Sequence, residues 1–273
     1  MLAWTFALLA LATQTHLAPQ PRVVVVRATE FKFEAPASVP AGTLTFRLEN
    51  HGLEVHHLWI VQLTHGKTAA DFTKMMDSWG TGPKMPEWAI DVGGPNNVAP
   101  GLAADATMTL APGTYMLLCY VPSADGTPHA MKGMLRPLTV TARGATKPRE
   151  PRADVAVTLV DYGFVISPAI TAGRHTLRFE DKAPQTHEAI LARLLPGHSL
   201  QDALAWYDNG QLGATPVVTL GGASGLANSR HMYMTADFVP GTYVLLCVMP
   251  DATDGRAHSD HGMVAQFTVA PKR

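Results

Sequence analysis

The sequence has almost no excess of charge of either sign: its 273 residues include 21 lysines and arginines against 22 aspartates and glutamates. Nucleic-acid-binding proteins usually carry a basic patch, and acidic disordered tails need a block of like charge, so the composition favours neither class. The length suggests about two domains, each long enough to bury a core of its own. We therefore expect a folded protein without a nucleic-acid partner.

Cysteine is scarce, and Cys119 and Cys247 are the two in the chain. They end two copies of one motif, because Gly-Thr-Tyr-Met-Leu-Leu-Cys at 113–119 returns as Gly-Thr-Tyr-Val-Leu-Leu-Cys at 241–247. A disulfide would have to join equivalent strand ends of two domains with separate cores, which is geometrically unfavourable. We predict two free thiols, each with a local role.

The apolar run at the N-terminus, Met1 to Ala12, is too short to span a bilayer. Ala10-Leu11-Ala12 has the small-x-small form of a signal-peptide cleavage site, although the basic residues that usually begin such a peptide are missing. We predict a signal peptide and short N-terminal segment over residues 1–20, a periplasmic or secreted protein, and no membrane span in the mature chain. The alternative is a buried N-terminal segment.

The two copies align over most of the chain at an offset of 128 to 131 residues; Gly42 matches Gly173, and Asn50 matches Asp181. A repeat this long indicates a duplicated domain, since solenoid repeats are about 20–50 residues. We predict domain 1 over residues 21–142, a charged, proline-containing linker over 143–152, and domain 2 over 153–273.

Short segments rich in β-branched residues, separated by turns, predict strands within each copy. Val23 to Val26, Thr43 to Leu48 and Thr114 to Leu118 fit this pattern, and the second alternates apolar with polar residues. Capping boxes at Thr68–Asp71 and Ser199–Asp202 predict one helix per copy, ending near Gly80 and Gly210. The predicted fold is all-β: two tandem Greek-key β-sandwich domains, each with a short inserted helix.

Each cysteine is followed by a histidine and then a methionine, and a further histidine lies upstream in each copy. A thiolate, two imidazoles and a weak thioether suit copper that alternates between two oxidation states. His57 competes with His56, and His261 competes with His258; the repeat favours His56 and His258. Met131 competes with Met134, which we favour because the preceding Gly133 and Gly262 fit a turn that presents the methionine. The predicted metal ligands are His56, Cys119, His129 and Met134 in the first copy, and His187, Cys247, His258 and Met263 in the second.

These residues make each repeat resemble a cupredoxin, the blue-copper family: an upstream His, then Gly-x-Tyr-x-x-x-Cys, then His and Met. The resemblance implies up to two type 1 copper sites, one per domain at most. It also implies electron transfer with a redox partner protein through the exposed edge of His129 or His258. Many cupredoxins place Asn after the upstream His to tie down the Cys loop, whereas this chain has His57 and Glu188.

Catalytic relatives also place a His beside the Cys, which here has Leu118 and Tyr120 as neighbours, and the chain contains no His-x-His. The resemblance therefore predicts neither a type 2 copper nor a trinuclear cluster. We expect no enzymatic site, unless histidines from two chains meet at an oligomer interface. The oligomeric state stays open. Two alternatives remain: an envelope copper-handling protein with a copper donor or acceptor as partner, using spare ligands such as Met75, Met76 and Met85, and a metal-free interaction module.

Overall fold

The computed structural model describes residues 20–79, 85–142 and 149–272. Most of the expected signal peptide, the helix end expected at Gly80 and most of the expected linker lie outside these ranges. We call residues 20–142 the first half, or first domain, and residues 149–272 the second half, or second domain. Within the described ranges, neither α-helix has the length and hydropathy that a bilayer crossing requires.

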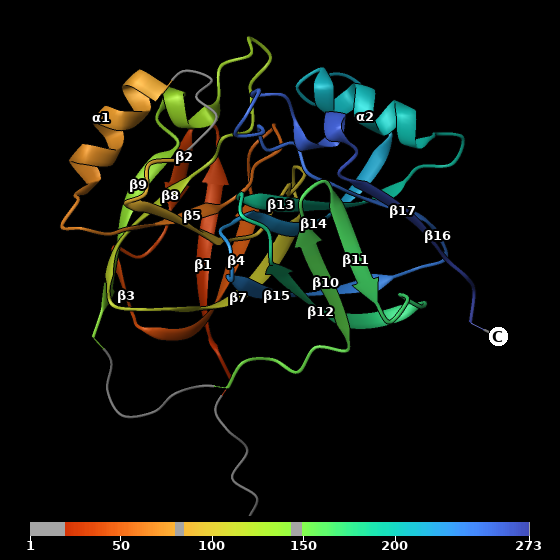
Figure 1. Cartoon of the computed structure of the whole chain (residues 1–273), viewed down its shortest axis with the longest axis horizontal. Coiled ribbons are helices and arrows are strands. Elements are labelled where there is room, and N and C mark those ends of the chain that lie inside the picture. The colour runs from red at the N-terminus through yellow and green to blue at the C-terminus, as the bar shows by residue number, and fades with distance from the viewer. Residues whose placement is uncertain (1–19, 80–84, 143–148, 273) are drawn as a thin grey trace, which may run out of the picture.

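Strands dominate both halves, as the short β-branched segments predict (Figure 1). The first half contributes β1 (Arg22–Thr29), β2 (Lys32–Glu34), β3 (Ser38–Pro40), β4 (Gly42–Asn50), β5 (Trp59–Leu63), β6 (Ala89–Gly93), β7 (Ala103–Leu110), β8 (Gly113–Leu118) and β9 (Leu135–Thr141). The second half contributes β10 (Val155–Val160), β11 (Gly163–Ser167), β12 (Gly173–Asp181), β13 (His187–Leu194), β14 (Val217–Leu226), β15 (His231–Phe238), β16 (Gly241–Leu246) and β17 (Val264–Val269). The all-β prediction is confirmed.

Strand β4 shows how the sequence pattern places residues on the two faces of a sheet. Leu44, Phe46 and Leu48 are buried, whereas Thr45 and Arg47 between them are partly exposed. The strand pairs in parallel with β1 and antiparallel with β7. Because side chains alternate between the faces of a strand, its apolar set faces the interior of the sandwich.

The two halves share both of their sheets. One sheet has the strand order β11-β10-β12-β15-β7-β4-β1-β2, and the other has β17-β16-β13-β14-β6-β5-β8-β9-β3. The halves join where Tyr233 of β15 pairs with Thr107 of β7 and where Leu226 of β14 pairs with Val92 of β6. The buried apolar residues between the sheets form one contiguous cluster drawn from both halves. The expectation of two separate cores is therefore wrong, because edge strands that would face solvent in a single domain pair with each other.

Two short α-helices interrupt the strands of the described chain, α1 (Ala69–Trp79) and α2 (Leu200–Asp208), and Figure 1 places them along the same edge of the molecule. Both begin with the predicted capping box. The Thr68 N–H and the Ser199 N–H donate to Asp71 and Asp202, at 2.8 and 2.7 Å. Gly210, with φ of 69°, follows the end of α2 in the left-handed conformation that favours glycine there.

Candidate metal centre

The first half brings its four predicted ligands to one end of the sandwich. His56 lies just before β5, Cys119 directly follows β8, and Met134 directly precedes β9. His129 begins a short 3-10 helix, η1 (His129–Lys132), in the loop between β8 and β9. Because β5, β8 and β9 are antiparallel neighbours in one sheet, the start of β5, the end of β8 and the start of β9 lie at the same end of the sheet.

Backbone hydrogen bonds fix the loop between Cys119 and Met134. The Cys119 N–H donates to the Met134 carbonyl at 3.1 Å, and the His129 N–H donates to the Val121 carbonyl at 2.9 Å. Gly133 ends η1 with φ of 105°, a conformation that residues with a side chain rarely adopt. This turn returns the chain so that Met134, directly before β9, lies beside Cys119.

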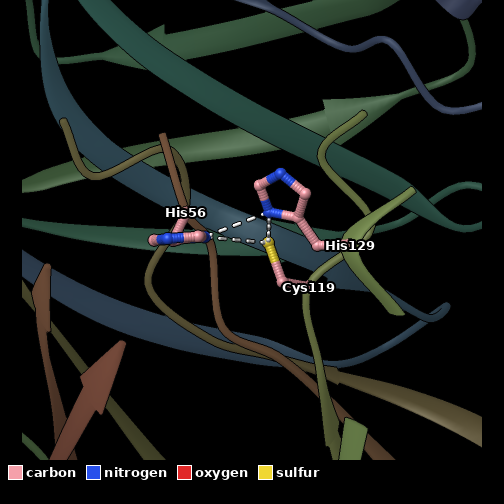
Figure 2. A group of neighbouring side chains, drawn as sticks. All are labelled: His56, Cys119 and His129. Atoms are coloured by element: carbon pink, nitrogen blue, oxygen red, sulfur yellow. Dashed lines mark hydrogen bonds between the residues drawn. The ribbon is translucent and has the colours of Figure 1, made fainter. Parts of the chain in front are cut away.

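Three donor atoms converge at this end of the first half (Figure 2). The Cys119 Sγ lies 3.4 Å from Nδ1 of His129 and 3.9 Å from Nδ1 of His56, and the two nitrogens are 3.1 Å apart. All three residues and Met134 are fully buried. A point between atoms at these separations lies roughly 2.0–2.3 Å from each, the length of metal–nitrogen and metal–sulfur bonds. The residues present therefore fit a metal ion.

Burial controls the protonation of these donors. It lowers the pKa of His56 to about 4, with a smaller contribution from the neighbouring His129, and it lowers the pKa of His129 as well. Burial also raises the pKa of the Cys119 thiol to about 12. Both imidazoles are thus neutral and able to donate a lone pair near pH 7, whereas the thiol must lose its proton when a metal binds.

The second half repeats the arrangement of the loop. The Cys247 N–H donates to the Met263 carbonyl at 3.2 Å, and His258 begins η2 (His258–His261). The Cys247 Sγ lies 3.4 Å from Nδ1 of His258, the same separation as in the first half. His187, Cys247, His258 and Met263 are all fully buried.

Both halves thus place a histidine, a cysteine, a second histidine and a methionine at matching strand ends of a two-sheet sandwich. The fold of each half is that of a cupredoxin. No protein-family model and no curated protein matches the chain.

Several solved structures are similar to about half of this chain. Auracyanin from Roseiflexus castenholzii is 22% identical over 45% of this chain and 99% of its own, with a TM-score of 0.33. The auracyanin A from Chloroflexus aurantiacus, a "blue" copper protein, is 23% identical over 44% of this chain and 99% of its own, with a TM-score of 0.32. A multicopper oxidase is 12% identical over 91% of this chain and 88% of its own, with a TM-score of 0.25.

His57 and Glu188, which stand where many cupredoxins have Asn, both tie down the Cys loop. The Tyr120 N–H donates to Nε2 of His57 at 2.7 Å, and the Val248 N–H donates to Oε1 of Glu188 at 3.2 Å. Each of the two residues also directs its own backbone N–H at the cysteine sulfur, at 3.4 Å in both domains. In both halves, the side chain at this position thus accepts the hydrogen bond from the residue that follows the cysteine.

His129 is enclosed by protein, which corrects the expectation of an exposed imidazole edge. Its Nε2 lies 2.7 Å from Oε2 of Glu54, and the ring of Phe31 packs edge-on against it at 5.3 Å. The Glu54 side chain is 37% exposed and so separates His129 from solvent. His258 is likewise fully buried, with its Nε2 3.4 Å from Gln185. A carboxylate on the outer nitrogen fixes the ring orientation and tautomer of His129.

The upstream histidine differs between the two domains. His56 directs Nδ1 towards His129 and Cys119, whereas Nδ1 of His187 lies 3.1 Å from Oδ2 of Asp181. Among the described residues, the donor atoms of His56, Cys119 and His129 lie within 4.8 Å of one another, and those of the second domain's equivalents do not form such a group.

The structure also shows where the competing residues lie. His57 faces Tyr120 and not the metal site, and the Met131 side chain is 40% exposed in the wall of a cleft between the domains. His261 lies 3.2 Å from Asp254 at the surface of the second domain.

The sequence motif does not include Glu54 or Asp181, although each contacts a predicted ligand histidine. The repeat carried a signal for both, because Glu54 stands opposite Gln185 and Asn50 opposite Asp181 at the same offset of 131 residues. When an amide in one half is matched by a carboxylate in the other, the neighbouring ligand histidine has different hydrogen-bonding partners in the two halves.

A cleft of about 1080 Å³ runs between the domains, next to both Cys loops. Its walls include Tyr120 and Val248, which follow the two cysteines, together with the buried carboxyl groups of Asp91 and Glu188. Asp91 accepts a hydrogen bond from the Thr186 hydroxyl at 2.8 Å across the domain boundary. Burial raises the pKa of Asp91 to about 7.

Proposed function

We propose that this chain is an exported, periplasmic or secreted, copper protein that carries single electrons, with a mononuclear type 1 copper site in its first domain. One observation carries the proposal: the Cys119 thiol and the Nδ1 atoms of His56 and His129 converge, with Met134 buried beside them. This donor set suits copper in both of its common oxidation states. The partner would be a redox protein that supplies or receives the electron.

Copper held by a thiolate, two imidazoles and a thioether supplies a centre that gains and loses one electron with little rearrangement. The chain's own residues keep the donors in place. The His57 N–H donates to the Cys119 sulfur, and the His57 ring holds the Tyr120 N–H that follows it. Glu54 orients His129 through its outer nitrogen. Full burial of the donors excludes water, which would otherwise add ligands.

The electron's path to a partner would cross the surface around Glu54, because this side chain lies between His129 and solvent. Leu53 beside it is 87% exposed, an unusually open position for a large apolar side chain. A redox partner that buries Leu53 would bring its own centre close to His129. We place the docking surface of the partner at this end of the first domain.

The test is the visible spectrum of the full chain after addition of Cu(II) and removal of unbound metal. We expect an intense thiolate-to-copper band that is lost in Cys119→Ala, and a reversible one-electron reduction of the same sample. Exposed Met131→Leu is a matched control that leaves the buried donors intact. Absence of any Cys119-dependent band in folded protein would reject the type 1 site, and irreversible reduction would reject the carrier role.

A copper-handling role is the second candidate, and the cleft between the domains favours it. Met85, Met131 and Met249 line this cleft together with His57, which gathers soft thioether ligands in one place. Cu(I) binding that survives in Cys119→Ala and weakens in Met85→Leu would support transfer of copper to or from a partner. Cu(I) binding that depends entirely on Cys119 would support the electron carrier.

A further inference from the structure

The residue six positions before the upstream histidine differs between the domains, and its hydrogen bonds differ with it. In the first domain this residue is Asn50. Its Nδ2 donates to the carbonyls of Glu54 and Val98, both at 2.8 Å, and its Oδ1 accepts from the Gly52 N–H at 2.8 Å. The side chain thus binds backbone groups alone, and Nδ1 of His56 faces His129 and Cys119.

The equivalent residue in the second domain, Asp181, has no N–H to donate. Its Oδ1 accepts from the Ala183 N–H at 2.8 Å, which reproduces the bond between Asn50 and Gly52. Its Oδ2 takes the place of the amide nitrogen and therefore needs donors in place of acceptors. It finds them in His187, whose backbone N–H and ring Nδ1 lie 3.0 and 3.1 Å away.

Both partners of this bond are fully buried. A hydrogen bond to a carboxylate is stronger than one between neutral groups, and water cannot compete for it in the interior. Metal binding through Nδ1 of His187 would break this bond and leave the carboxylate oxygen without its ring donor. The outer nitrogen of His187 lies 3.4 Å from Asp161, so the ring lies between two carboxylates.

We propose that Asp181 masks the second copper site by holding Nδ1 of His187, so that the first domain loads copper and the second does not. The inference rests on the proposed copper function and adds that one residue decides which domain is metallated. Cys247, His258 and Met263 keep the geometry of ligands, and the missing donor is the imidazole nitrogen that Asp181 occupies. Replacing Asp181 with Asn would supply the amide that the first domain uses.

The experiment measures copper bound per chain and the thiolate-to-copper band in full-length Cys119→Ala, which isolates the second site. We expect little copper and no band in this variant. Adding Asp181→Asn should strengthen copper binding by about 10–100-fold, the usual effect of residues that orient a ligand, and create a band that Cys247→Ala removes. Adding Asp161→Asn is the matched control: it removes the same charge beside the same ring and leaves the Nδ1 bond intact, so no band should appear.

A Cys247-dependent band already present in Cys119→Ala would overturn the inference. So would a folded Cys119→Ala/Asp181→Asn protein, judged by its thermal melt, that gains no copper. If that variant does not fold, long-range ¹H–¹⁵N NMR of the metal-free protein decides: a protonated Nδ1 on His187 supports the bond to Asp181, and an unprotonated Nδ1 rejects it. Failure of the proposed function has a different signature, the absence of a Cys119-dependent band in the unmodified chain.

Discussion

At the scale of single residues, the two domains perform the same task with different chemistry. An imidazole in the first domain and a carboxylate in the second accept the N–H that follows the cysteine. Burial lowers the pKa of His57 to about 3, and the side chain of Asn96 opposes this shift. His57 is therefore neutral near pH 7 and can accept this hydrogen bond.

Replacing His57 with Leu should lower the free energy of unfolding by about 1–3 kcal/mol, because the Tyr120 N–H loses a buried acceptor. Chemical denaturation of the metal-free protein measures the loss. His57→Asn, which restores the residue common in cupredoxins, should lose less, and His51→Leu at an exposed position should change stability little. Equal losses in His57→Leu and His51→Leu would contradict the role assigned to the bond.

Asp91 should make stability depend on pH. The unfolded chain ionises this group near pH 4, whereas burial keeps its pKa at about 7 in the folded protein. Between these pH values the folded state binds more protons than the unfolded state. The contribution of Asp91 to the free energy of unfolding is therefore fully present below about pH 4 and is lost as the pH rises to about 7.

We expect the stability of Asp91→Asn relative to the unmodified protein to rise over this pH range, by up to about 1.4 kcal/mol per pH unit. Urea denaturation at several pH values measures the difference, with Asp77→Asn on the exposed face of α1 as control. A difference that does not vary with pH would show that Asp91 ionises normally in the folded protein.

At the scale of elements, matching glycine pairs shape the strands that join the domains. Gly94 follows β6 and Gly222 lies in β14, with φ of 144° and 130°. A Cβ on Gly94 would lie 1.8 Å from the Leu58 carbonyl oxygen, and one on Gly222 would lie 1.9 Å from the Ala189 carbonyl oxygen. Backbone cannot move aside as a flexible side chain can, so the close approach of the strands requires glycine at both positions.

Gly222→Ala should therefore cost at least about 3 kcal/mol of unfolding free energy, the upper part of the range for overpacking. Gly197→Ala is the matched control, since Gly197 also has a positive φ, 83°, but a Cβ there meets nothing within 4 Å. That variant should lose about 1–2 kcal/mol from backbone strain alone. Similar losses in both variants, measured by denaturant titration, would mean that the contact with Ala189 relaxes easily.

At the scale of the whole molecule, the two domains are joined through both sheets and through one core cluster. Both sheets continue from one half to the other, and buried polar contacts cross the boundary. Asn96 donates to Glu188 at 2.9 Å and to the Ala223 carbonyl at 3.1 Å, and the Ser224 N–H donates to the Gly94 carbonyl at 2.9 Å. Separating the halves would expose these groups together with the shared core.

We expect the metal-free chain to unfold in a single calorimetric transition whose calorimetric and van't Hoff enthalpies agree. Asn96→Ala should lower the melting temperature without splitting the transition, because it weakens the boundary and leaves the shared core in place. Residues 20–142 expressed alone should be unstable or self-associate through β6 and β7. Two transitions, each reproduced by an isolated half, would contradict a single folding unit.

The sequence by itself determined the duplication, the strand pattern and the residue types of the candidate site. Alternation in β4, the capping boxes before α1 and α2 and the doubled Cys-His-Met order are local signals, because they depend on spacing along one segment. The two free thiols followed from the same repeat and are confirmed. These features needed no knowledge of which segments meet in space.

Only the tertiary structure decided which partners the buried polar groups find. Asn50 and Asp181 occupy matched positions, yet one binds backbone and the other binds a ligand histidine, because an amide can donate and a carboxylate cannot. The burial of His129 under Glu54 and the fusion of the two cores likewise depend on residues distant in sequence. A repeat predicts that two domains have the same fold, whereas long-range hydrogen bonds determine how similar their two candidate metal sites are.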